Sequence, residues 1–258
     1  AAASPQAPAQ APANVPVDRP TIDAGPPRDV TWQQGPARRP SGKQPPNIIL
    51  IVADDLGYND LSFNGGGVAG GAVPTPFIDS IGRQGVNFEQ AYAGHGTCAP
   101  SRAALLTGRY PTRYGFEFTP TPLRFARQVR AFHYGPLNPV YFPEREKDLI
   151  PMVEMGVPTD QVMLGELLQK SGYHTIQLGK WHLGEAPKFQ PQNRGFSETL
   201  GFTGGGSMFL PKEDPRIVNS IQGFDPIDMN LWASLQFYVR KDGGEAVQPK
   251  PHMTDYLT

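Results

Sequence analysis

The sequence predicts an α/β fold, with a mixed and largely parallel sheet sandwiched by helices. Two short segments, Ile48–Ala53 and Tyr173–Leu178, are expected to be strands, and polar residues follow both. The first is continuously apolar and rich in β-branched residues, which is typical of a buried parallel strand. A short strand is also expected around Val86–Phe88. Helix signals lie between and beside these runs, and strands alternating with helices favour an α/β sandwich.

The predicted helices have clear boundary residues. Thr75 can cap a helix that Pro76 opens and Gly85 ends, with the apolar face supplied by Phe77, Ile78 and Ile81. Thr159-Asp160 is a good cap for a second helix, which contains several leucines and ends just before Gly172. Each of these helices is followed by one of the expected strands.

Composition limits the classes of function. The 258 residues are enough for one large domain with a hydrophobic core, and the formal net charge of −1 provides no basic field for nucleic acid or an anionic membrane. The longest apolar stretch, Ile48–Ala53, is too short to cross a bilayer. A single cysteine excludes an internal disulfide and a cysteine-rich metal site. We therefore expect no nucleic-acid partner and no transmembrane segment.

The first 46 residues form a separate compositional region. Residues 1–46 contain eleven prolines and almost no periodic apolar pattern, so they cannot bury enough surface to offset the entropy of ordering. We interpret them as a disordered Pro/Ala-rich spacer, with a Pro-rich protein-binding segment as the alternative. The chain begins with small residues and no methionine, which suggests a removed signal peptide and a secreted or periplasmic protein.

Polar residues follow both predicted strands. Asp54-Asp55 comes directly after the first strand, where ligands bind in open α/β sheets, and two adjacent carboxylates there are costly unless a cation neutralises them. Lys180 and His182 come directly after the second strand and share one face if the chain is extended. These two strand ends are the first candidates for a functional site.

The only cysteine has an unusual setting. Pro100 suits the first position of a helix, so Cys98 is expected at a helix N-terminus, where the dipole favours negative charge. Together with nearby Arg102, this predicts a reactive thiolate. The alternative for a lone cysteine is a small buried hydrophobic residue.

Two motifs give these residues a context. Cys98-Ala99-Pro100-Ser101-Arg102, followed by a helix ending at Thr107-Gly108, resembles one signature of the sulfatase family, and residues 172–184 resemble a second. The resemblance is to the formylglycine-dependent, arylsulfatase-like members of the alkaline phosphatase superfamily. It implies a sulfatase/alkaline-phosphatase-like fold, with residues 47–258 as the N-terminal part of a truncated catalytic domain.

The resemblance also implies a chemistry. In the family, the cysteine that corresponds to Cys98 is oxidised to formylglycine by a generating enzyme that recognises the context here given by Cys98, Pro100 and Arg102. The hydrated aldehyde attacks the sulfur of a sulfate ester with one hydroxyl and displaces the alcohol. Its second hydroxyl then expels sulfate and restores the aldehyde. The expected function is sulfate-ester hydrolysis by a sulfuric ester hydrolase.

Individual roles carry over from the two motifs. Asp54, Asp55 and the oxygen at position 98 match calcium ligands. Arg102 matches the residue that stabilises the hydrated aldehyde, and Lys180 the one that holds a sulfate oxygen. His182 matches the histidine on the aldehyde hydrate, a base for the release of sulfate.

The family pattern is incomplete here, since a downstream Asp-Asn metal pair and a further His and Lys are not identifiable. The chain is therefore expected to be inactive on its own. Sulfated carbohydrates, sulfated phenols and alkyl sulfates all remain open as substrates. Hydrolysis of phosphodiesters or phosphonate esters is an alternative reaction, and a noncatalytic sulfate-binding protein is an alternative of another class.

Several weaker features have two interpretations. His95 could line the pocket or be satisfied within its loop, and His174 is expected to be structural. The glycine clusters 65–67 and 204–206 could form anion-binding nests or flexible loops. The irregular stretch from Thr119 to Pro158 could shape a substrate mouth or form a surface lid. It carries these basic and aromatic residues: Arg124, Phe125, Arg127, Arg130, Phe132, His133, Tyr134, Tyr141 and Phe142.

Overall fold

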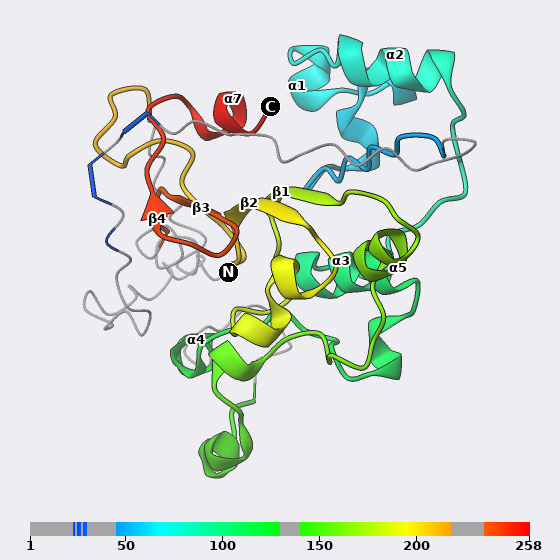
Figure 1. Cartoon of the computed structure of the whole chain (residues 1–258). Helices are drawn as coiled ribbons and strands as arrows, with labels where there is room; N and C mark the ends of the chain where they lie inside the picture. The colour runs from blue at the N-terminus through cyan, green and yellow to red at the C-terminus, as the bar shows by residue number, and fades with distance from the viewer. Residues whose placement is uncertain (1–22, 24, 27, 30–44, 130–139, 218–234) are drawn as a thin grey trace, which may run out of the picture.

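The fold is known from a computed structural model, drawn in Figure 1. The structure describes residues 23, 25–26, 28–29, 45–129, 140–217 and 235–258. The spacer predicted over residues 1–46, with the expected leader cleavage before it, falls almost wholly outside the described residues, as does 130–139 of the predicted substrate-mouth stretch. Within the described ranges, no helix is long and apolar enough to cross a membrane.

A four-stranded mixed sheet forms the centre of the molecule. Its order is β1 (Ile176–Lys180), β2 (Glu198–Phe202), β3 (Val239–Lys241) and β4 (Ala246–Val247). Strands β1 and β2 are parallel, with Lys180 opposite Phe202, whereas β3 pairs antiparallel with both of its neighbours. The predicted mixed α/β fold is confirmed, and the second expected strand occurs two to three residues later than its pattern suggested.

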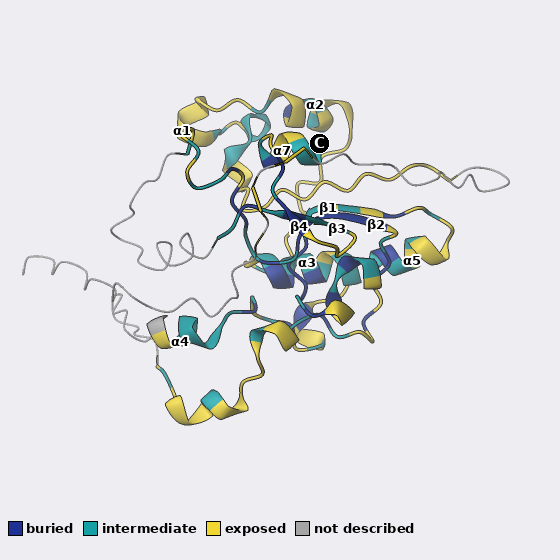
Figure 2. Ribbon diagram, turned by 60° about the vertical axis from the view of Figure 1, so that its left-hand side comes forward, coloured by how far each residue is buried: buried dark blue, intermediate teal, exposed yellow. Residues whose placement is uncertain are grey.

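Helices cover the two sides of this sheet. Figures 1 and 2 show α3 and α5 on one side of β1 and β2 and α7 on the other. The helices are α1 (Val68–Gly71), α2 (Pro76–Gln84), α3 (Cys98–Thr107), α4 (Leu123–Val129), α5 (Leu164–Lys170) and α7 (Met253–Leu257). Short 3-10 helices are Tyr58–Asp60, Ser62–Asn64, Pro111–Arg113, Pro143–Asp148, Met152–Glu154, Pro187–Phe189 and Pro191–Asn193.

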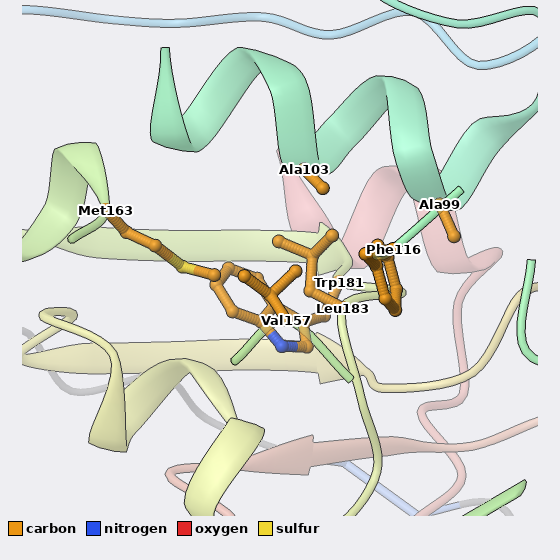
Figure 3. Packing of buried hydrophobic residues seen from close by; sticks show 7 residues of the cluster. All are labelled: Ala99, Ala103, Phe116, Val157, Met163, Trp181 and Leu183. Carbon is orange, nitrogen blue, oxygen red and sulfur yellow. The ribbon is translucent and has the colours of Figure 1, made fainter. Parts of the chain in front are cut away.

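One hydrophobic core lies between the end of β1 and helix α3. Figure 3 shows its seven buried residues, Ala99, Ala103, Phe116, Val157, Met163, Trp181 and Leu183. Helix α3 contributes two alanines, whose small side chains let the helix approach closely. The Trp181 indole nitrogen donates a hydrogen bond of 2.8 Å to the Phe189 carbonyl, which satisfies its one polar atom. This core fixes the chain on both sides of His182.

A second core holds α7 against the other strands. It consists of Leu200, Phe202, Met208, Phe237, Val239, Val247 and Met253. Met253 at the start of α7 is fully buried, and its backbone N–H donates to the Phe209 carbonyl at 3.0 Å. The sheet is therefore packed on two sides along β2, where all five residues are buried.

The local helix signals were accurate for α2 and α3. Helix α2 begins at Pro76 and ends before Gly85, as predicted. Helix α3 begins at Cys98, so the cysteine lies at a helix N-terminus, and it ends at Gly108 in the left-handed conformation (φ 64°) that glycine adopts without strain. Pro100 occupies the third helical position, not the first.

The predicted start of the next helix was wrong. Thr159-Asp160 forms a turn, and α5 begins only at Leu164, where the Glu166 carboxylate accepts a hydrogen bond of 2.6 Å from the Met163 N–H. The reason is tertiary. Arg194 is 1% exposed and donates to the carbonyls of Val157 and Gln161, so these groups are held outside a helix.

The apolar run Ile48–Ala53 does not form the predicted buried strand. It has no strand assignment, and its side chains are exposed, Ile49 to 86%. Ile48, Leu50 and Val52 instead line one side of a cavity of about 490 Å³, and Ile176 and Leu178 of β1 line it too. A strand needs a partner for its backbone groups, and composition alone does not supply one.

Two other predicted apolar elements are exposed for the same reason. Val86 and Phe88 are each 76% exposed and form no strand. On α2, the expected inner face is also exposed, with Phe77 at 86%. Helix α2 itself is present, so the local signals predicted the helical backbone correctly. They did not predict which residues would pack against it.

We expect Arg194→Met to lower the free energy of unfolding by about 2–4 kcal/mol, because it leaves two buried carbonyls without their charged donor. Chemical denaturation followed by circular dichroism measures this change. Arg83→Met is the matched control, since the Arg83 side chain is 59% exposed. Equal denaturation midpoints for the two variants would contradict a structural role for Arg194.

Candidate functional site

Three segments distant in sequence meet at the carboxyl end of β1. They are the chain after Ala53, the first turns of α3 and the last residue of β1, Lys180. Arg102 lies four residues after Cys98 on α3, so the two side chains are neighbours on one helix face. The structure therefore brings together Asp54, Arg102 and Lys180, which the sequence predicted for one site.

The carboxylate of Asp54 connects these segments. Its Oδ2 accepts a bond of 2.6 Å from the Lys180 ammonium, and its Oδ1 accepts one of 3.0 Å from Arg102 Nη2. Arg102 Nη1 also donates to the Lys180 backbone carbonyl at 2.8 Å. The Lys180 and Arg102 side chains are only 10% and 14% exposed, compared with 38% for Asp54. Both cations are thus held largely out of water around one carboxylate.

The charge of Asp54 is stabilised by this arrangement. Partial burial raises the pKa of Asp54, but the hydrogen bonds and positive charges of Lys180 and Arg102 outweigh it, so its pKa lies below the usual value. Asp54 is therefore anionic at neutral pH. Its carboxylate is available to cations only in competition with two protein side chains.

Two glycines position Lys180. Gly179 has a left-handed φ of 81°, a conformation that favours glycine, and it faces Gly201 across the parallel β1–β2 pair. A Cβ at Gly201 would lie 2.0 Å from the Gly179 carbonyl oxygen, so the backbones approach more closely than any side chain would permit. The bend at Gly179 and the approach of β2 fix the end of β1, from which Lys180 extends.

Cys98 is half-buried at the start of α3. Its Sγ lies 3.9 Å from the hydroxyl of Thr119, in the loop that follows the next 3-10 helix. Thr119 is not among the site residues that the sequence predicts. Its only signal was its place at the start of the irregular stretch considered as a substrate mouth.

His182 lies deeper than Lys180. It is 5% exposed, its backbone has a positive φ of 63°, and its N–H donates to the Thr203 carbonyl at 3.1 Å. The chain is therefore not extended at this residue, and the face that Lys180 and His182 were expected to share is not formed by a regular strand. The imidazole is held next to the segment that follows β2.

Asp54 and Asp55 form an acidic pair whose carboxylate oxygens are possible metal ligands. Asp55 is exposed, with a left-handed φ of 55°, and Asp54 is already bonded to two cations. Among the described residues, no group of three or more His, Cys, Asp or Glu side chains is placed to hold a metal ion. Carboxylate oxygens suit calcium, which takes roughly six to eight oxygen ligands. Asp54 and Asp55 thus do not complete a calcium site by themselves.

The weaker candidates are satisfied locally. His95 Nδ1 accepts a bond of 3.1 Å from the Thr97 N–H, and His174 pairs with Glu198 at 2.6 Å between Nε2 and Oε1. His174 thus joins the chain just before β1 to the start of β2, in agreement with the structural role expected for it. In the first glycine cluster, Gly65 and Gly67 have positive φ values of 80° and 120°.

The geometry suits an anion that carries its charge on several oxygens. The chain has a net charge of −1, so the attraction must be local, and Lys180 and Arg102 supply it at the carboxyl end of β1. Arg102 offers a planar fork of donors, and Lys180 offers a single ammonium at the strand end.

The chain is similar to known sulfatases. A family model described as Sulfatase matches residues 46–237. N-acetylgalactosamine-6-sulfatase of Mus musculus is 39% identical over 158 residues, which are 61% of this chain and 26% of that enzyme. Arylsulfatase A of Homo sapiens is 37% identical over 160 residues, with 61% and 25% coverage. The chain spans about a quarter of the length of these curated relatives.

One similar solved structure is described as the crystal structure of Ps i-CgsB. It superposes with a TM-score of 0.56 at 35% sequence identity, over 83% of this chain and 39% of that chain. The similarity therefore extends from sequence to fold, and residues 46–237 contain every candidate site residue.

We expect Arg102→Lys to loosen the end of β1, because one ammonium cannot replace a fork that binds both the Asp54 carboxylate and the Lys180 carbonyl. Hydrogen exchange at the Trp181 and His182 amides should accelerate about five- to tenfold, equivalent to about 1 kcal/mol. Arg113→Lys, at an exposed residue that ends a 3-10 helix, is the control and should change nothing at these amides. Unchanged exchange rates in Arg102→Lys would show that the two contacts of Arg102 do not hold the end of β1 in place.

Proposed function

The chain belongs to the sulfatase family, and we propose that the protein hydrolyses sulfate esters at the carboxyl end of β1, with an oxidised Cys98 as the nucleophile. The observation that supports the proposal is the meeting of Asp54, Arg102 and Lys180 at the carboxyl end of β1, with Arg102 one helical turn after Cys98 on α3. A sulfate ester presents anionic oxygens, and two largely buried cations at one strand end are suited to bind them.

The proposed roles combine the family motifs with the surroundings of each group. The Lys180 ammonium, 10% exposed, binds a sulfate oxygen and stabilises the charge that develops there during transfer. Arg102 orients the side chain at position 98, one helical turn away, and balances the charge of Asp54. His182 moves a proton at the position-98 hydroxyl, a role suited to imidazole near neutral pH.

The nucleophile requires a modification of Cys98. We propose its oxidation to formylglycine with loss of the thiol sulfur, for which the partner, a formylglycine-generating enzyme that recognises Cys98, Pro100 and Arg102, supplies the oxidant. A hydrated aldehyde supplies two hydroxyls on one carbon, one for attack on sulfur and one for release of sulfate. The side chain at position 98 is half-buried at a helix N-terminus, which favours negative charge on an attacking oxygen.

Calcium is the proposed metal, with Asp54, Asp55 and the oxygen at position 98 as ligands. The support is the oxygen chemistry of the two carboxylates, the low pKa of Asp54 and the family of the chain. Because these groups fill only part of a calcium shell, we propose that further ligands come from sequence outside the described residues. The proposal for calcium is that it binds at these oxygen donors.

The proposed substrate class is a sulfate ester, with no particular alcohol group assigned. N-acetylgalactosamine-6-sulfatase and arylsulfatase A have names that refer to different substrates, and the residues of this site address only the sulfate end. Aryl sulfates, sulfated carbohydrates and alkyl sulfates are therefore the panel to assay. Phosphodiesters belong in the same panel as the competing reaction.

We expect an aldehyde at position 98 when the protein is produced together with a generating enzyme, and peptide mass spectrometry measures it. In a form extended to the length of the relatives, Cys98→Ala should lower the turnover of sulfate esters by about a thousandfold or more, because the nucleophile is lost. Cys98→Ser should allow one transfer that stalls, since a single hydroxyl cannot expel sulfate. An active protein with only a thiol at position 98, or rapid turnover by the serine variant, would refute the mechanism.

We expect the 258-residue chain alone neither to bind calcium tightly nor to hydrolyse sulfate esters at an enzymatic rate. The reasons are the partial ligand set and the exposed apolar run Ile48–Ala53 beside the site. Calcium titration by calorimetry and a sulfatase assay should compare this chain with a form extended to the length of its relatives. Equal binding and activity in the two forms would show that groups within these residues complete the site.

A further inference from the structure

The second glycine cluster, 204–206, has neither of the two structures considered from sequence. An anion-binding nest requires a left-handed residue, and none of these three glycines has a positive φ. A flexible surface loop would be exposed, whereas Gly204 is buried and Gly205 and Gly206 are half-buried. A different physical reason must account for glycine here.

The reason is the imidazole of His182. A Cβ built on Gly205 would lie 2.7 Å from His182 Nε2 and 2.8 Å from Cε1, closer than real Cβ contacts come. The ring therefore fills the space that a side chain at position 205 would need. At Gly206 the nearest atom to such a Cβ is the terminal methyl Cδ2 of Leu235, at 3.1 Å, which can move aside.

The ring has little freedom to yield. His182 is 5% exposed, and its neighbours in the chain, Trp181 and Leu183, are core residues exposed to 2% and 0%. Its backbone is fixed by the hydrogen bond from its N–H to the Thr203 carbonyl, two residues before Gly205. A side chain at position 205 would push the imidazole, because the backbone beneath it is held from both sides.

We infer that Gly205 is a positioning residue, which sets the place and orientation of the His182 imidazole through the absence of a side chain. This inference rests on the proposed function for the proton transfer that His182 performs. Gly205 acts through His182 and does not contact the substrate. A displacement of a catalytic group by about 1 Å can cost about a hundredfold in rate, so one methyl group is enough to matter.

The test compares Gly205→Ala with Gly206→Ala in the full-length, aldehyde-bearing protein. We expect Gly205→Ala to lower kcat for a sulfate ester about ten- to a hundredfold with KM nearly unchanged, because the sulfate oxygens are bound by Lys180 and not by His182. Gly206→Ala should stay within about threefold of the parent kcat, because Leu235 can adjust. In a His182→Ala background, Gly205→Ala should not lower kcat further, because the imidazole that the added methyl group would push is then absent.

A spectroscopic measurement separates positioning from general damage. In the 258-residue chain, the histidine ring signal that disappears in His182→Ala identifies His182 among the five histidines. That signal should shift in Gly205→Ala and stay in place in Gly206→Ala. An unmoved signal, or an equal loss of kcat by Gly205→Ala with and without His182, overturns the inference. If the parent protein does not hydrolyse sulfate esters, the proposed function fails, and the ring signal alone decides whether Gly205 positions His182.

Discussion

The site depends on the contacts that the Asp54 carboxylate makes with Lys180 and Arg102. The chain from Ile48 to Asp55 has no strand pairing, and its apolar side chains are exposed, so the bonds from Lys180 and Arg102 to Asp54 are what attach it beside the site. Asp54 is 38% exposed, so water weakens these ion pairs and their energy is modest. Their importance is geometric, because they join the end of β1 and the start of α3 to one carboxylate.

The sequence predicted those features that depend on local signals. Cys98 lies at a helix N-terminus, and α2 begins at Pro76 and ends before Gly85. Each signal acts within one or two turns, where capping and backbone preferences dominate. The meeting of Arg102, Lys180 and Asp54 also followed, but from the resemblance to a family and not from any local rule.

The features that the sequence did not predict depend on partners far along the chain. Ile48–Ala53 has the composition of a buried strand, yet a strand forms only where another backbone accepts its hydrogen bonds. Helix α5 begins late because Arg194, more than 30 residues downstream, binds the carbonyls of Val157 and Gln161. Composition describes what a segment can bury, but the neighbours in space decide whether it does.

The same distinction explains which site residues were found. Charged residues in a motif are visible because their chemistry is specific, whereas Gly201 and Gly205 are visible only once the atoms opposite them are known. Gly201 leaves room for the carbonyl of Gly179, and Gly205 leaves room for the imidazole of His182. Both lie on or just after β2, which carries none of the predicted site residues. Lys180 and His182 therefore depend for their positions on β2 and on the segment that follows it, because glycines there leave room for the Gly179 carbonyl and the His182 ring.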